Sequence, residues 1–163
     1  MKYAGFTLIE LIVVISVTAV LSIIGIAAFV TYSRTQALTT SVLDIVTMLQ
    51  VAKSRAQSQV KPDAAPCLDG YRVAILSSNK TYQMFAVCLP NDYPVAGYTK
   101  KLPSNICFDA SATTTTSILF RVLTGGVGGG GDIQINGYGS GFKITVNSAG
   151  NIVFIKTVGR VCS

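Results

Sequence analysis

Histidine and tryptophan are absent from this chain of 163 residues, and Glu10 is its single glutamate. Without histidine, no Ser-His-Asp triad can be assembled, and without a second glutamate no glutamate pair is available for acid–base catalysis. Five of the six aspartates lie in turn-like contexts rich in Gly, Asn, Ser or Pro, where turn formation explains them. The sequence therefore predicts a protein that is not an enzyme and has no catalytic residues and no cofactor.

The CxxC spacing typical of zinc sites is also missing, although the chain has four cysteines, Cys67, Cys88, Cys107 and Cys162. An even number in a domain beyond a membrane fits two disulfides in an oxidising space, and three pairings are possible. Cys67 and Cys88 flank the strand-like stretches "YRVAI" and "TYQMFAV", so both would lie at the open end of a hairpin. This favours Cys67 with Cys88 and leaves Cys107 with Cys162, and no metal is predicted.

Acidic residues are few: 13 Lys and Arg face 7 Asp and Glu, and the formal net charge is +6. A basic balance leaves attraction to anionic lipid, polysaccharide or nucleic acid open. The basic residues are scattered along the chain, which makes nucleic acid a possible but disfavoured partner.

Charge is missing altogether from Leu11 to Val30. At about 1.5 Å per helical residue this run matches the roughly 30 Å of a bilayer's hydrocarbon core, so it is predicted to span a membrane. It is longer than a secretory signal's apolar region and no small-residue cleavage site closes it. Lys2 would hold the N-terminus in the cytoplasm and send the rest of the chain across. Glu10 lies at the edge of this run, and its carboxylate costs a few kcal/mol there unless it reaches the interface or finds a partner.

Helical periodicity continues beyond the apolar run. Apolar residues recur at i, i+4 and i+7 on one stripe, namely Leu38, Val42, Ile45, Val46, Leu49, Ala52 and Ala56. One helix from about Thr7 to Gln59 is the simplest interpretation. Pro62 and Pro66 disfavour helix beyond it.

Strand-like runs follow Cys67. We predict strands at 72–76, 82–88, 118–123, 133–138, 142–146 and 152–158. The turns "NGYGSG" and "NSAGN" would join the last three into a meander. The stretch "PNDYPVAGYTKKLPSN" is interpreted as a long loop, and so is "TGGVGGGGD", because a strand-like run rather than a helix follows its glycines. The predicted fold is α+β, a long helix packed on an antiparallel sheet.

The run "GFTLIE" at the start of this helix resembles the leader signal of type IV prepilins and type II secretion pseudopilins. The resemblance implies cleavage after Gly5 by a prepilin peptidase, methylation of Phe6 as the new N-terminus, and pairing of Glu10 with the N-terminal amine of a neighbouring subunit. It also implies a pilin-like fold with a leader at 1–5, a transmembrane and assembly helix at 6–30 and a head at 31–163, in which the helix continues to about residue 60.

The family's implied partners are other pilin or pseudopilin subunits, an inner-membrane assembly platform and the lipid bilayer. The implied location is the inner (cytoplasmic) membrane, crossed once with the head outside the cytoplasm, and then the pilus or pseudopilus. The resemblance does not say which of these filaments the chain serves.

Further along, the chain is similar to the helix-to-sheet junction of minor subunits related to pseudopilin H and the FimT pilins. The similarity lies in "LQVAKSRAQSQVKP", which is followed by a cysteine and then by the strand-like run "YRVAI". Some FimT proteins carry a Gly-Arg-x-Arg motif linked with DNA binding. Here "GRVC" keeps Gly159 and Arg160 but has Cys162 at the next basic position. Lys143, Lys156 and Arg160 are the residues that folding could gather into a nucleic-acid contact, so DNA capture for uptake is the alternative function. A membrane-anchored enzyme is a less favoured alternative, because the sequence gives no sign of the clustered polar pocket that it would need.

Overall fold

The computed structural model describes residues 7–160 and 162, without the side chains of residues 23–25 and 27. A long helix, α1 (Leu8–Gln57), precedes all the strands. These are β1 (Gly70–Leu76), β2 (Thr81–Cys88), β3 (Asn91–Lys101), β4 (Ile106–Phe108), β5 (Ser117–Arg121), β6 (Gly131–Gly137), β7 (Ser140–Val146) and β8 (Ile152–Val158), with a 3-10 turn, η1 (Ser77–Asn79), between β1 and β2. The chain divides into two compact units, Met1–Ala37 and Leu38–Ser163.

Local interactions fix both ends of α1. At its start, the Thr7 hydroxyl accepts a hydrogen bond from the Glu10 amide at 3.3 Å, which identifies Thr7 as the N-cap. At its end, Gln59 adopts positive φ while its amide bonds to the Ala56 carbonyl and the Val60 amide bonds to the Arg55 carbonyl. This is a Schellman motif, and it ends the helix before Pro62 can interrupt it.

The first unit contains the part of α1 from Leu8 to Ala37, whose described apolar side chains are exposed, with Leu8 77% and Phe29 70% accessible. Among the described residues, no helix is both long enough and apolar enough to cross a membrane. The predicted span at 11–30 includes positions 23–25 and 27, whose side chains lie outside the described residues.

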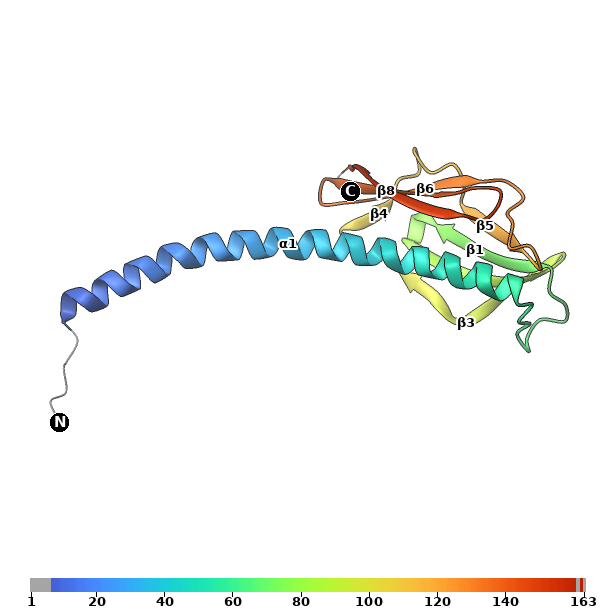
Figure 1. Cartoon of the computed structure of the whole chain (residues 1–163), viewed down its shortest axis with the longest axis horizontal. Coiled ribbons are helices and arrows are strands. Elements are labelled where there is room, and N and C mark those ends of the chain that lie inside the picture. The colour runs from blue at the N-terminus through green and yellow to red at the C-terminus, as the bar shows by residue number, and fades with distance from the viewer. Residues whose placement is uncertain (1–6, 161, 163) are drawn as a thin grey trace. The chain divides into compact units, whose positions relative to one another are not determined.

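The second unit, the head, contains two antiparallel four-stranded sheets (Figure 1). The first sheet has the order β3-β2-β1-β5, and the second has the order β4-β6-β7-β8. The second half of α1 runs along both of them, so the fold is α+β as the sequence predicts.

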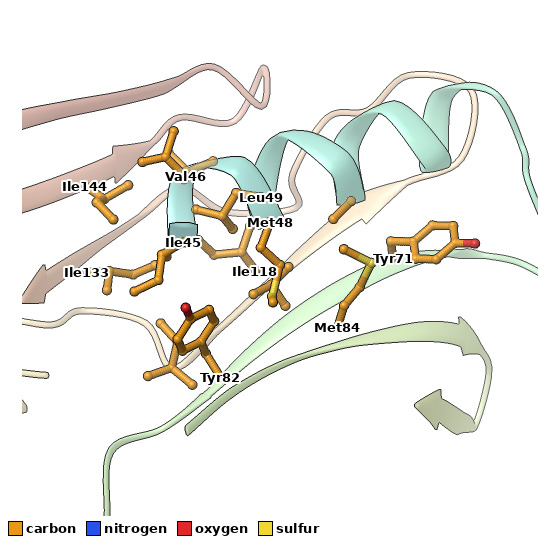
Figure 2. Packing of buried hydrophobic residues seen from close by; sticks show 14 of the residues in the cluster. Ile45, Val46, Met48, Leu49, Tyr71, Tyr82, Met84, Ile118, Ile133 and Ile144 are labelled. Carbon is orange, nitrogen blue, oxygen red and sulfur yellow. The ribbon is translucent and has the colours of Figure 1, made fainter. Parts of the chain in front are cut away.

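The core of the head lies where α1 meets the two sheets. Figure 2 shows Ile45 and Leu49 of α1 among side chains of both sheets, with Ile118 from the first and Ile133 and Ile144 from the second. All of these are at most 2% exposed. Every residue of the predicted helical stripe from Leu38 to Ala56 is buried, because one face of the helix supplies the apolar surface that both sheets cover.

The last three strands form the predicted meander. Gly137 pairs with Ser140, so β6 and β7 are joined by the two residues Tyr138 and Gly139, both with positive φ. That is the geometry of a type I′ turn, which matches the twist of the flanking strands. The predicted strands agree with the observed ones to within a residue or two at each end.

The interpretation of residues 90–105 as a loop is wrong, because most of this stretch forms β3, and β4 follows directly after it. β3 is an edge strand that pairs only with β2, and its register shifts between Gln83 and Phe85. Gly97 lies within this irregular part and has φ +81°. Pro94, which pairs with Phe85, lies at its edge. An edge strand with a bulge accepts residues that would break a central strand.

Candidate functional site

The start of α1 is the first candidate site. Glu10 lies in its first turn, and its side chain is exposed. A carboxylate there is stabilised by about 0.3–1 kcal/mol through the helix dipole at a solvent-exposed position. Gly5 and Phe6, the expected cleavage and methylation positions, lie outside the described residues. No cation pairs with Glu10 in the part of the chain that the structure describes.

Thr7 is a residue of this site that the sequence interpretation missed. Thr7 and Glu10 stand at the spacing of a capping box, in which an N-cap hydroxyl is followed three residues later by a glutamate. The signal is readable in the sequence as "TLIE", but the leader motif overlaps it. The backbone of Glu10 is therefore fixed by the cap at the start of α1.

Two disulfides cross-link the head. They join Cys67 to Cys88 and Cys107 to Cys162, which is the pairing that the hairpin argument favours. The first closes the open end of the β1–β2 hairpin, where Asp69 also accepts a hydrogen bond from the Leu89 amide at 2.8 Å. The second ties β4 to the segment after β8. All four cysteines are thus used in structure.

The three basic residues proposed for nucleic-acid contact do not form one cluster. Phe142 of β7 is opposite Lys156 of β8, and Lys143 is opposite Ile155. Because opposite residues share a face and neighbours along a strand alternate, Lys143 and Lys156 lie on opposite faces of the second sheet. Lys143 is also paired with Asp132, with 2.8 Å between Nζ and Oδ2.

The two aspartates of the second sheet have lowered pKa values. The hydrogen bond from Lys143 holds the pKa of Asp132 below its usual range, and Thr145 adds to the effect. Ser111 lowers the pKa of Asp109, with smaller contributions in the same direction from Asn136 and Arg160. Both carboxylates are therefore stable anions that accept hydrogen bonds within the head, rather than groups poised to exchange protons near neutral pH.

Two tyrosines of the first sheet, the buried Tyr82 and the half-buried Tyr98, lie close to side chains of α1. Burial raises the pKa of Tyr82 to about 12, and the nearby Asp44 carboxylate adds to the rise. Arg55 donates to the Tyr98 hydroxyl at 3.1 Å and lies 4.7 Å from its ring centroid. These contacts attach α1 to the sheet, and they present no group with the geometry of a catalytic acid, base or nucleophile.

Comparison with known proteins gives two findings. Residues 1–29 match the prokaryotic N-terminal methylation motif. The fold is similar to that of the minor pseudopilin EpsH from the type 2 secretion system of Vibrio cholerae, with a TM-score of 0.57 and 10% sequence identity over 72% of this chain and 95% of that one. No curated protein matches the chain.

Proposed function

We propose that this chain, which belongs to the type IV pilin and pseudopilin family, is a minor structural subunit that works by polymerising through α1. The observation that carries the proposal is the combination of a methylation motif at residues 1–29 with a pilin-like head on the same helix. Its role is structural rather than enzymatic. The apolar part of α1 would hold the protein in the inner membrane before assembly and pack against neighbouring helices afterwards.

Processing follows from the position of the motif. A prepilin peptidase would cut after Gly5, and methylated Phe6 would become the first residue, so that its amine stands one residue before the N-cap Thr7. The Glu10 carboxylate would then pair with the amine of the next subunit. The attraction between two opposite charges is stronger at low dielectric than in water, while an unpaired buried charge is strongly unfavourable. This pairing would give the apolar helix a register in the filament.

The likeness to a minor pseudopilin supports a minor rather than a major role. An inner-membrane assembly platform and the lipid bilayer are the further partners that the proposal requires. Immunogold labelling of sheared filaments, beside a secretion assay in a strain lacking the chain, distinguishes a pilus subunit from a pseudopilus subunit. Labelling along the whole filament would contradict the minor role.

The first test is intact-mass measurement of the protein from its native host. We expect a mass that begins at Phe6 and includes one methyl group. A mature N-terminus elsewhere, or retention of Met1, would refute the assignment.

The second test separates pairing from helix capping. Glu10→Leu and Glu10→Gln both remove the charge, and we expect both to leave membrane retention intact while lowering incorporation into filaments. Thr7→Ala is the matched control, because it removes the cap, at a cost of about 1 kcal/mol, and keeps the carboxylate. Equal loss of incorporation in Thr7→Ala would show that capping, not pairing, is what Glu10 provides.

A further inference from the structure

The turn between β1 and β2 brings together two lysines that are distant in sequence. Lys80 ends η1, and Lys101 ends β3, where it pairs with Thr81 across the first sheet. Both line one open surface pocket of 530 Å³, together with Ser78, Asn79 and Thr81. The lining residues therefore carry two ammonium groups, two hydroxyls and a side-chain amide, which is chemistry suited to a phosphate group.

We call Lys80 and Lys101 together the basic turn. Within the described residues, no carboxylate of the head forms an ion pair with either lysine. Lys80 Nζ donates to the uncharged Ser104 carbonyl at 2.7 Å. Among the described residues, no carboxylate is within ion-pair distance of Lys101. The neighbouring Lys100 is paired with Asp44 at 3.0 Å, which accounts for that carboxylate. The sequence has no acidic residue at 70–91 or at 93–108.

The basic turn lies at the end of the head where the helix enters. The far end of β2 is near the end of α1. The Asp69 amide donates to the Val87 carbonyl, the Asp69 carbonyl accepts from the Val122 amide, and the next amide, of Leu123, donates to the Ala56 carbonyl. β2 runs from Thr81 toward that end, so its start lies at the opposite end of the head. The Lys100–Asp44 pair, early in the head's part of the helix, agrees with this.

Only a short stretch of chain, residues 31–37, separates the apolar run from the head. As helix, it separates Val30 from Leu38 by about 12 Å, against roughly 5 to 8 Å for the headgroup region on one side of a bilayer. The intervening sequence "TYSRTQA" contains Tyr32 and Arg34, residue types that are frequent at membrane interfaces. This short connection is compatible with contact between lysines of the head and the lipid phosphates.

We propose that the basic turn is a docking surface for the headgroups of anionic phospholipids, and that it holds the head against the bilayer before assembly. The proposal rests on the proposed function, because it requires α1 to be anchored in the membrane. Each lysine near an anionic surface strengthens binding about fivefold at moderate salt. Two lysines give a reversible contact that a neighbouring subunit can replace.

The test uses the full chain reconstituted in vesicles. A fluorescent donor on Leu76→Cys, an exposed position near the basic turn but outside the pocket lining, reports energy transfer to an acceptor on the lipid headgroup. We expect higher transfer in vesicles of phosphatidylcholine with phosphatidylglycerol than in phosphatidylcholine alone, and loss of the difference at high salt. Lys80→Gln with Lys101→Gln should reduce the equilibrium constant for docking about fivefold per lysine. Glutamine at position 80 can still donate to Ser104.

The matched control is Lys61→Gln with Arg121→Gln, which removes the same charge from exposed positions at the other end of the head. We expect it to leave the lipid dependence unchanged. Alkaline washing separates the two proposals. A chain that is washed off the vesicles would refute both, whereas a retained chain whose transfer ignores phosphatidylglycerol, or responds equally to both double variants, would refute docking and leave the anchor standing.

Discussion

Leu49→Ala measures how strongly the head depends on the helix. Leu49 is fully buried, and its side chain lies in the core where α1 meets both sheets (Figure 2). Removing three carbons loses about 2 to 2.5 kcal/mol of transfer free energy. A cavity held open by two sheets cannot collapse fully, so the total loss of unfolding free energy should be about 3 to 5 kcal/mol.

The assay is thermal unfolding of the full chain in detergent, followed by near-ultraviolet circular dichroism. Tyr71 and Tyr82 are buried at 0% and 2% exposure, so they report the packing of the head rather than the helix content. At about 4 °C per kcal/mol for a domain of this size, the midpoint should fall by roughly 10 to 20 °C.

Leu43→Ala is the control, because Leu43 is on the same helix and 45% exposed. Its effect should stay within about 1 kcal/mol. Similar midpoints for the two variants would refute the assignment of the helix stripe to the core, and with it the claim that the second half of α1 belongs to the head.

Three further predictions concern the head. Replacing Cys107 and Cys162 by serine should cost about 4 kcal/mol of unfolding free energy, and replacing Cys67 and Cys88 about 3 kcal/mol, because the sequence separations are 55 and 21 residues. Denaturant titration in detergent measures both losses. A larger loss for the second pair would contradict the chain-entropy argument. Asp132→Asn should cost at most about 1 kcal/mol at neutral pH, since its pair with Lys143 is partly exposed. Because the folded pKa of Asp132 is lowered, its contribution is complete above its ordinary pKa and is lost as pH falls through the folded value, so wild type and variant should converge in acid; a constant difference would mean that the charge is not responsible. The full chain should bind double-stranded DNA weakly and lose binding at modest salt; tight binding whose salt slope falls by several units in Lys143→Ala, Lys156→Ala and Arg160→Ala would instead favour DNA capture, since each phosphate contact contributes about one unit.

Hydrophobic periodicity and the positions of the cysteines were enough to predict the parts of the fold that depend on local patterns. The stripe from Leu38 to Ala56 repeats at helical spacing, so the buried face of α1 could be read before any partner was known. The flanking positions of Cys67 and Cys88 predicted the disulfide at the open end of a hairpin, because strand pairing fixes which ends meet. Turn chemistry predicted the β6–β7 hairpin in the same way.

Local patterns gave the wrong prediction where a residue's fit in a strand depends on whether that strand is at the edge or in the middle of a sheet. Pro94 and Gly97 suggested a loop, yet they lie in β3, since an edge strand does not need every amide for pairing. Three-residue β4 is too short to give any periodic signal, and only its pairing with β6 defines it.

The sequence by itself determined the motif at the start of α1, the helix that follows it and the residues that the helix buries, because each depends on neighbours along the chain. Only the tertiary structure decided which distant side chains meet. Register separates Lys143 from Lys156, although both are on neighbouring strands. The pairing of Thr81 with Lys101 brings Lys80 to the same pocket as Lys101, although 20 residues intervene between the two lysines along the chain. Charge counts cannot distinguish these cases, since a one-residue difference in register moves a side chain to the other face of the sheet.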